Sequence, residues 1–254
     1  MSKAEVAYYP GCSALTTERP SLKTAEAVLK RLGVPYRLLE DAPCCGTVEL
    51  EMVDREASRR VSEIVAEAAG GATLVTGCSG CYGTLRRGGV EVRHLVEFLG
   101  RDIGAEEIAK RAIRSWPVKV APYYGCQALR PREQAIDDPE DPQILEELLA
   151  AIGAEPVNFR MRLKCCGGPI FLRRPERARQ LAKSVLESAS LAGAECVVTI
   201  CNLCHFMLDF YGGGTLPVLH VTQPIAYALG EPMESLGLED HFTPVHRRLF
   251  QPRP

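Results

Sequence analysis

The sequence predicts an α/β protein built from two pseudo-symmetric halves, each a small parallel-sheet unit with cysteines at its strand ends. Three observations predict this fold. The cysteine spacing repeats, short apolar runs alternate with helical segments, and 254 residues suffice for two small hydrophobic cores. Alternating strands and helices favour parallel sheets, because the helices form the crossovers between neighbouring strands.

Ten of the eleven cysteines form two sets with the same order of motifs: a single cysteine, a Cys-Cys-Gly and a Cys-x-x-Cys. The first set is Cys12, Cys44, Cys45, Cys78 and Cys81. The second set is Cys126, Cys165, Cys166, Cys201 and Cys204. The segments before the first cysteine of each set, VAYYPGC and VAPYYGC, repeat as well. We infer two homologous domains, residues 1–115 and 116–254.

The elements of the first half follow from apolar periodicity and stop signals. We expect them in this order: a strand over 5–9, a helix over 21–32 stopped by Gly33, a strand over 36–40, a helix over 54–69, a strand into Cys78 and a last β–α piece with His94. On the helix over 54–69 we expect Val61, Ile64, Val65 and Ala68 to share one face.

The second half repeats this order. We expect a strand over 118–123, a helix over 142–152 capped by Asp141 and stopped by Gly153, a strand over 155–159, a helix over 175–191, a strand into Cys201 and a β–α piece with His220. The basic tail over 245–254, with Arg247, Arg248 and Arg253, is predicted to be a surface arm rather than part of the core.

Composition and charge exclude several classes of protein. With 30 Lys and Arg against 32 Asp and Glu, the net charge of -2 gives no reason to bind nucleic acid. The N-terminus does not have the pattern of a secretory signal, and no apolar run reaches the ~20 residues of a membrane span. We therefore expect a cytoplasmic protein, where thiols stay reduced and cysteine clusters indicate metal or redox chemistry.

Three kinds of site compete for five thiols at converging strand ends. Zinc prefers four ligands in a closed tetrahedron, and an adjacent Cys-Cys pair fits that poorly. Thioredoxin-like chemistry needs a single Cys-x-x-Cys and leaves the other thiols without a role. An iron–sulfur centre uses soft thiolates and tolerates varied spacing, so the residues favour it over the other two.

The two motifs resemble the cysteine-rich CCG domains of the heterodisulfide reductase family, in its B subunit. The resemblance extends over nearly the whole chain and is carried by these segments: YYPGCS at 8–13, GCSGCYGTL at 77–85, VRHLVEFL at 92–99, YYGCQALRP at 123–131, CCGG at 165–168, CNLCHFMLD at 201–209 and PVLH at 217–220. Relatives of this family also take part in lactate utilisation, fumarate reduction with thiols and sulfur-compound oxidation.

The resemblance implies a non-cubane [4Fe-4S] cluster in each half, held by all five cysteines of its set. It further implies reduction of a disulfide, in some members that of coenzyme M and coenzyme B. The implied partners are a ferredoxin-like iron–sulfur subunit and a flavoprotein subunit of the same complex. The chain itself has no GxGxxG or Walker motif, and Gly212–Gly214 is predicted to be a turn, so we expect no flavin or nicotinamide site here.

Other side chains near the motifs are weaker candidates. His205 adjoins Cys204 and is a candidate proton donor, as are the repeated His94 and His220, although packing roles fit all three. Paired tyrosines before the first cysteine of each set are expected to shield the clusters from water: Tyr8, Tyr9, Tyr123 and Tyr124. Cys196, outside both sets, is expected to be a small buried side chain.

Two functions follow from these predictions. The first is a catalytic subunit that cleaves or forms a disulfide in a cleft between the halves, because domain interfaces are favoured binding sites. The alternative is an electron-transfer subunit of a lactate- or other dehydrogenase-type complex, with no substrate of its own. Both use the same ten cysteines.

Overall fold

The computed structural model describes residues 5–47 and 49–251, and its strands form two four-stranded parallel sheets. The first sheet has the order β2-β1-β3-β4, and the second has the matching order β6-β5-β7-β8. The strands are β1 (Val6–Tyr9), β2 (Tyr36–Leu38), β3 (Thr73–Thr76), β4 (Arg93–His94), β5 (Lys119–Tyr123), β6 (Glu155–Pro156), β7 (Cys196–Thr199) and β8 (Val218–His220). The predicted α/β class with two parallel sheets is confirmed.

The central strands are apolar because they are covered on both faces. All four residues of β1 and all four of β7 are buried, as expected for strands inside a parallel sheet. In register, Val6 of β1 pairs with Thr73 of β3, and Val120 of β5 pairs with Cys196 of β7. Cys196 therefore lies in the core, as predicted.

The helices follow the strands as crossovers. They are α1 (Gly11–Leu15), α2 (Arg19–Arg31), α3 (Glu49–Val53), α4 (Arg55–Ala69), α5 (Ser79–Arg87), α6 (Leu95–Glu97), the π-helical turn η1 (Phe98–Gly104), α7 (Ala105–Arg111), α8 (Ile144–Ala151), α9 (Pro175–Leu191), α10 (Asn202–Tyr211) and α11 (Thr222–Ala228). Short 3₁₀ turns are η2 (Arg132–Gln134), η3 (Gly168–Ile170), η4 (Met233–Ser235), η5 (Leu238–Asp240) and η6 (Arg247–Phe250). The predicted turn at Gly212–Gly214 follows α10, with Gly213 and Gly214 at positive φ.

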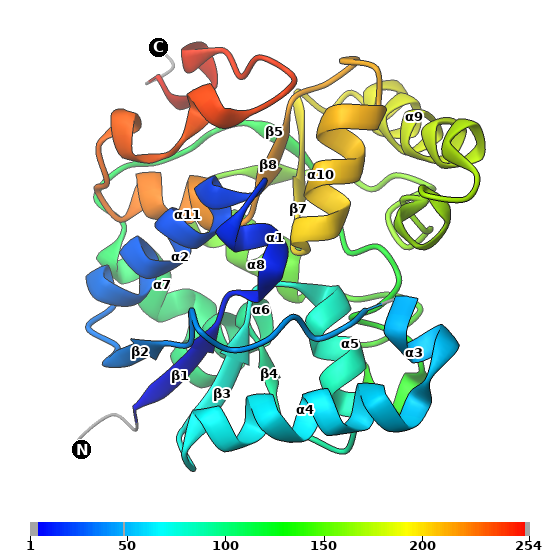
Figure 1. The fold of residues 1–254 in the computed structure, drawn as a ribbon. Helices are drawn as coiled ribbons and strands as arrows, with labels where there is room; N and C mark the ends of the chain where they lie inside the picture. Colours follow the sequence, from blue (N-terminus) through cyan, green and yellow to red (C-terminus); the bar gives the residue numbers. More distant parts are fainter. Residues whose placement is uncertain (1–4, 48, 252–254) are drawn as a thin grey trace.

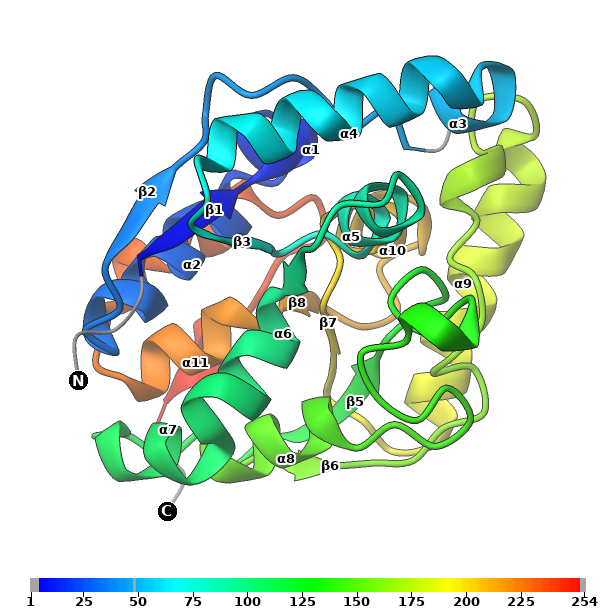
Figure 2. The same cartoon turned by 90° about the horizontal axis from the view of Figure 1, so that it is seen from below.

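Helices of the two halves pack against one another across the interface. Helix α2 of the first half packs against α11 of the second, and α8 of the second half packs against α7 and η1 of the first. Figures 1 and 2 show α2 and α11 side by side in both views. A buried hydrogen bond of 2.7 Å between the hydroxyls of Thr24 and Thr222 joins the first pair. Each half therefore completes the core of the other.

Two local predictions about helices are wrong. Helix α8 is not capped by Asp141: Asp137 Oδ2 accepts the amides of Gln143 and Ile144 at 2.7 and 2.8 Å. The Asp141 carboxylate pairs instead with Arg162, which draws it away from the helix end. On α4, Ile64 is 49% exposed because Val65, rather than Ile64, lies on the face that meets the core.

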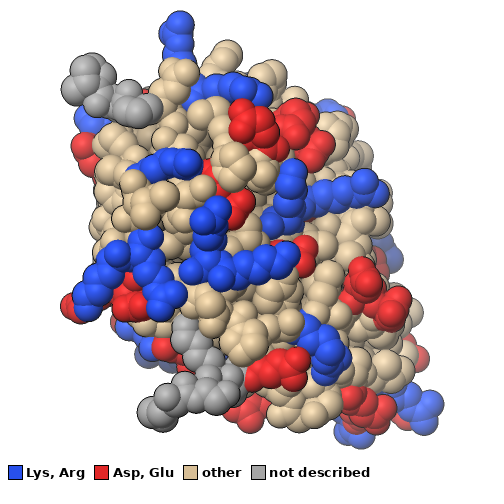
Figure 3. All heavy atoms as spheres, turned by 90° about the vertical axis from the view of Figure 1, so that its left-hand side faces the viewer, with Lys and Arg blue, Asp and Glu red and all other residues tan. Residues whose placement is uncertain are grey.

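The described part of the C-terminal tail, residues 245–251, is not a surface arm. Phe250 is 1% exposed, its ring stacks on Trp116 at 5.8 Å, and the Trp116 indole donates to the Leu249 carbonyl at 2.7 Å. Apolar side chains thus hold a basic segment on the core. Arg247 faces Glu234 at 3.6 Å. On the face of the molecule that Figure 3 shows, Lys and Arg side chains lie among Asp and Glu side chains. Arg253 lies outside the described residues.

Candidate iron–sulfur site between the two halves

The ten cysteines lie at the carboxyl ends of the strands, where ligands bind in open parallel sheets. Cys12 lies in α1 directly after β1, and Cys126 follows β5. Cys78 and Cys201 precede the first residues of α5 and α10, while Cys81 and Cys204 lie one turn inside these helices. The Cys-Cys pairs are in the loops before α3 and η3.

Within each set the same pairs of cysteines are in contact. Cys44 Sγ lies 3.3 Å from Cys12 Sγ, and Cys45 Sγ lies 3.3 Å from Cys81 Sγ. In the second set Cys165 interacts with Cys126, and Cys166 with Cys204. The hydrogen bond with the single cysteine of the set lowers the pKa of Cys44 to about 2 and that of Cys165 to about 3. Thiolates, the form that binds metals, are thus favoured at equivalent positions.

The two sets meet at the interface between the halves. Cys78 Sγ and Cys201 Sγ, both buried, are 3.9 Å apart. The backbone amide of Gly80, from the first half, also hydrogen-bonds the Cys201 sulfur. The sets differ at the surface, because Cys12 and Cys44 are exposed whereas Cys126 and Cys165 are half-buried. The structure therefore places two thiol clusters in contact, one of them more open to solvent.

Glycines allow the backbone to approach the sulfurs closely. Gly11 has φ +73°, and a Cβ added there would lie 2.8 Å from Cys81 Sγ. The equivalent Gly125 has φ +70°, and its added Cβ would lie 3.1 Å from Cys204 Sγ. Neither position has room for a side chain, and the left-handed conformation also favours glycine at both.

Tyrosines hold the loops that carry the Cys-Cys pairs. The Tyr9 hydroxyl donates to the carbonyl of Pro43 at 2.7 Å, and the equivalent Tyr123 hydroxyl donates to Lys164 at 2.6 Å. Burial raises the pKa of both phenols well above the ordinary value, so both remain donors. Because Pro43 and Lys164 directly precede the Cys-Cys pairs, these contacts position them, a role that the repeated tyrosine pair alone did not reveal.

His94 and His220 reach across the interface in opposite directions. His94 contacts the Ser79 hydroxyl at 3.2 Å and the backbone of Ile200, next to Cys201. The Nε2 atom of His220 lies 3.3 Å from the Gly77 carbonyl, next to Cys78. Burial lowers the pKa of His94 to about 4 and that of His220 to about 3, which keeps both rings neutral at pH 7. Each histidine thus braces the opposite Cys-x-x-Cys strand.

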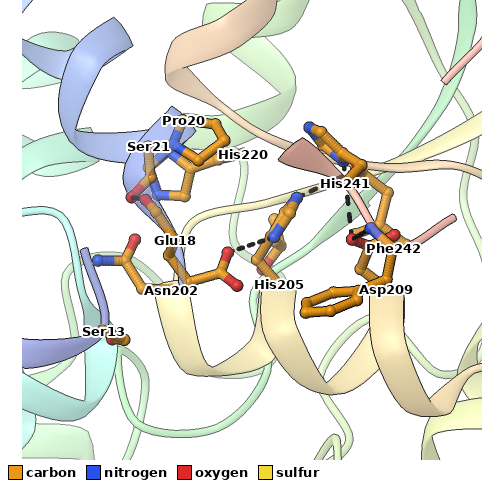
Figure 4. Close-up of polar contacts among 12 residues, drawn as sticks. Ser13, Glu18, Pro20, Ser21, Asn202, His205, Asp209, His220, His241 and Phe242 are labelled. Carbon is orange, nitrogen blue, oxygen red and sulfur yellow. Dashed lines mark hydrogen bonds and ion pairs between the residues drawn. The ribbon is translucent and has the colours of Figure 1, made fainter. Parts of the chain in front are cut away.

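His205 has a buried acidic partner that sequence inspection did not single out. Its Nδ1 pairs with the Glu18 carboxylate, from the segment between α1 and α2, and its Nε2 lies 3.1 Å from the Val218 carbonyl. Figure 4 shows Glu18 and His205 directed toward one another, with Asp209 and His241 beside them. Burial opposes the charge, but Glu18 holds the pKa of His205 above its ordinary value. Glu18 carries no motif, so only the fold identifies it.

A small hollow borders the second set. Three first-half residues, Thr47, Ser79 and Gly80, line it together with Gln127, Pro169, Leu203 and all five cysteines of the second set. Two larger surface hollows, of about 650 and 710 Å³, contain none of the ten cysteines. Among the described residues, no group of three or more His, Cys, Asp or Glu side chains has the arrangement of a single metal-ion site.

The fold and these paired thiol sets define a class of protein with duplicated cysteine-rich domains. The CCG cysteine-rich domain family matches residues 6–86 and 120–209, and the chain belongs to this family and carries two copies of its domain. No helix in the described part of the chain is long and apolar enough to cross a membrane.

Particular relatives extend the comparison over most of the chain. The 8-methylmenaquinol:fumarate reductase membrane anchor subunit of Wolinella succinogenes is 30% identical, covering 92% of this chain and 95% of that protein. The B subunit of a ferredoxin/F420H2-dependent CoB-CoM heterodisulfide reductase of Methanosarcina acetivorans is 28% identical, covering 94% and 93%. The resemblance to the B subunit of heterodisulfide reductase is thus confirmed.

One solved structure shares the fold. A hypothetical protein from Helicobacter pylori superposes with a TM-score of 0.75 at 12% identity, covering 97% of this chain. This chain spans 55% of that protein. At such low identity the likeness concerns the fold alone.

Proposed function

We propose that this chain is the iron–sulfur catalytic subunit of a heterodisulfide reductase-like complex, which cleaves or forms a disulfide with two non-cubane [4Fe-4S] clusters. Each cluster would be held by the five cysteines of one set. The observation that carries the proposal is the contact between two equivalent thiol sets, with Cys78 and Cys201 sulfurs 3.9 Å apart. Relatives named as B subunits of heterodisulfide reductases support it.

The donor set suits iron–sulfur clusters. Ten soft thiols gather in two groups, and thiolates are favoured at Cys44 and Cys165. Backbone amides face the sulfurs, among them Gly167 N, which donates to Cys165 Sγ at 3.4 Å. Such amides stabilise the negative charge of thiolates and sulfides, as at other iron–sulfur sites.

The chemistry needs two electrons at one place. Cleaving a disulfide consumes two electrons and two protons and yields two thiols, and each cluster would supply one electron. The chain holds the two sets next to one another, and it buries Cys78 and Cys201 away from water. We place the disulfide at the interface between the halves, beside the two thiol sets.

Relatives named as B subunits of ferredoxin-dependent heterodisulfide reductases support a supply of electrons from other subunits. We propose a ferredoxin-like iron–sulfur subunit and a flavoprotein subunit as partners. The edge at Cys12 and Cys44 is the exposed side of the first set and suits electron entry. Leu249 and Phe250 anchor the tail on the core, whereas Arg247 and Arg248 are exposed.

Metal analysis and a disulfide assay test this proposal. Anaerobically purified protein should contain about eight irons and matching acid-labile sulfide, as two four-iron clusters require. It should also oxidise a reduced viologen dye when coenzyme M–coenzyme B heterodisulfide or another low-molecular-weight disulfide is added. Zinc without sulfide would overturn the proposal, and so would a full iron content with no response to any disulfide.

The second candidate is an electron-transfer subunit with no substrate of its own. The 30% identical relative, named as a subunit of a fumarate reductase, supports this alternative. The two candidates differ in one readout: the electron-transfer subunit keeps its iron and sulfide but shows the same EPR spectrum during reduction with and without a disulfide.

A further inference from the structure

Thr47 lies between the two thiol sets. It directly follows the Cys44–Cys45–Gly46 motif, and its backbone amide hydrogen-bonds the Cys45 sulfur of the first set. Thr47 also lines the hollow that is bordered by the five cysteines of the second set. One residue therefore contacts the first set with its backbone and also borders the second.

The Thr47 hydroxyl has no partner. Its Oγ1 is buried, and no hydrogen-bonding group among the described residues contacts it. A buried hydroxyl without a partner is costly, and such groups in native proteins usually face a ligand, an ion or a water molecule. The same hollow presents five cysteine sulfurs, so a group bound there by these cysteines would be sulfur-rich and negatively charged.

A second donor from the first half points the same way. The amide of Gly80 hydrogen-bonds Cys201, and a Cβ added at Gly80 would lie 2.9 Å from Thr47 Cγ2. The Gly80 backbone and the Thr47 side chain are thus packed together where the two sets meet, since the same Cβ would lie 3.6 Å from Cys78 Sγ. Because Gly80 has no side chain, the Thr47 side chain can pack against its backbone.

The first set has no equivalent side chain. In the second half the residue after the Cys165–Cys166–Gly167 motif is Gly168, which has no hydroxyl to offer. The space where its Cβ would lie is taken by Leu203, 2.9 Å away. The interface is therefore asymmetric at this position, with a hydroxyl from the first half and none from the second.

We propose that the Thr47 hydroxyl of the first half donates a hydrogen bond to a sulfur of the cluster held by the second set, and thereby raises the reduction potential of that cluster. This inference rests on the proposed function. A donor stabilises the more negative, reduced form of an iron–sulfur cluster, so the hydroxyl favours electron uptake at the second set. Thr47 thus adds a second difference between the two sets, beside their difference in exposure to solvent.

The test compares Thr47→Val, which keeps the shape but removes the hydroxyl, with Thr47→Ser, which keeps the hydroxyl. Both are purified anaerobically as full chains, and their EPR signals are followed during potentiometric titration. Cys126→Ala, which lacks a ligand of the second set, identifies the signal of the first. Thr47→Val should shift only the second-set signal to a lower potential, whereas Thr47→Ser should titrate like the wild type.

Iron and sulfide analysis separates this inference from the proposed function. Wild-type protein without iron and sulfide would overturn the function itself. Wild-type protein with both clusters, but with unchanged potentials in Thr47→Val or a shift confined to the first, would overturn only the role of Thr47. If Thr47→Val does not fold, Gly80→Ala displaces the Thr47 side chain and should lower the same potential; an unchanged second-set potential in this variant would also refute the role.

Discussion

Single residues set how closely the backbone can approach the thiols. Gly11 is in the left-handed region and in contact with Cys81, and Gly125 repeats both features next to Cys204. Elsewhere the chain has glycines at positive φ that face open space, such as Gly89. Gly11 and Gly89 both need a left-handed backbone conformation, but only Gly11 also lies against a cysteine sulfur.

Gly11→Ala should therefore disturb the first thiol set, whereas Gly89→Ala should not. Both variants place alanine at positive φ and should lose about 1–2 kcal/mol of stability. Only Gly11→Ala also pushes on Cys81, so only this variant should lose iron from the first set. Thermal unfolding and iron content of the two proteins check this. Equal iron contents would show that the approach to Cys81 is not needed for cluster binding.

The Glu18–His205 pair is a single-residue feature with an effect on stability. Both side chains are nearly inaccessible, and they come from opposite halves. Removing one partner of a buried ion pair leaves the other without compensation. The pair therefore links the segment after α1 to helix α10.

Glu18→Gln should lower the free energy of unfolding by about 3 kcal/mol near neutral pH. The pKa of His205 is raised by Glu18, and burial raises that of Glu18, so the folded state binds protons more tightly than the unfolded state at both positions. This stabilisation is present at low pH and is lost as the pH rises through the raised pKa of His205.

Urea unfolding of wild type and Glu18→Gln under reducing conditions, at about pH 6 and about pH 9, measures the effect. The gap between the two proteins should be larger at the lower pH. A gap that is the same at both values would contradict a charged pair.

Among the elements, the 3₁₀ turn η6 shows how composition can mislead. Its arginines suggest a solvated arm, but the next two residues, Leu249 and Phe250, are buried, and the Phe250 ring packs on Trp116 and Tyr227. The indole hydrogen bond to Leu249 fixes the backbone of the turn. This short turn thus closes the end of the second half.

Phe250→Ala should cost about 3–5 kcal/mol, the usual range for a buried phenylalanine. The matched control is Phe242→Ala, whose ring is 51% exposed and should cost about 1 kcal/mol or less. Chemical denaturation of the two variants gives the comparison. Similar small losses in both would restore the interpretation of the tail as a surface arm.

An element could be predicted from the sequence where the residues that begin and end it are close to it along the chain. Helix α9 spans the predicted residues 175–191, because a proline begins it and its apolar period is regular. Helix α8 was predicted with the wrong cap, because Asp137 is further from the helix in sequence than Asp141 and is brought back by the loop. Strand β6 has only two residues, since its pairing with β5 ends after Pro156.

At the scale of the whole molecule, each half packs one of its helices against the last helix of the other half. The first long helix of each half packs on the terminal helix of the other, through α2 with α11 and α8 with α7. Apolar faces of α2 and α8 are buried in these contacts, with Val28 and Leu148 fully inaccessible. A half on its own would expose these faces to water.

Residues 1–115 alone should therefore fail to give a cooperative unfolding transition, and co-expression with residues 116–254 should restore one. Circular dichroism during thermal unfolding measures this for each half and for the pair. A cooperative transition of the isolated first half near the melting temperature of the full chain would show that the proposed domains fold independently.

The sequence by itself determined the duplicated α/β architecture and the two sets of five cysteines, because strand alternation and motif spacing record local geometry. Only the tertiary structure decided that the sets meet through Cys78 and Cys201, that Glu18 pairs with His205, and that Thr47 lies at the second set. These contacts join residues from opposite halves. They depend on how the interlocked helices pack, and no periodicity along the chain encodes that packing.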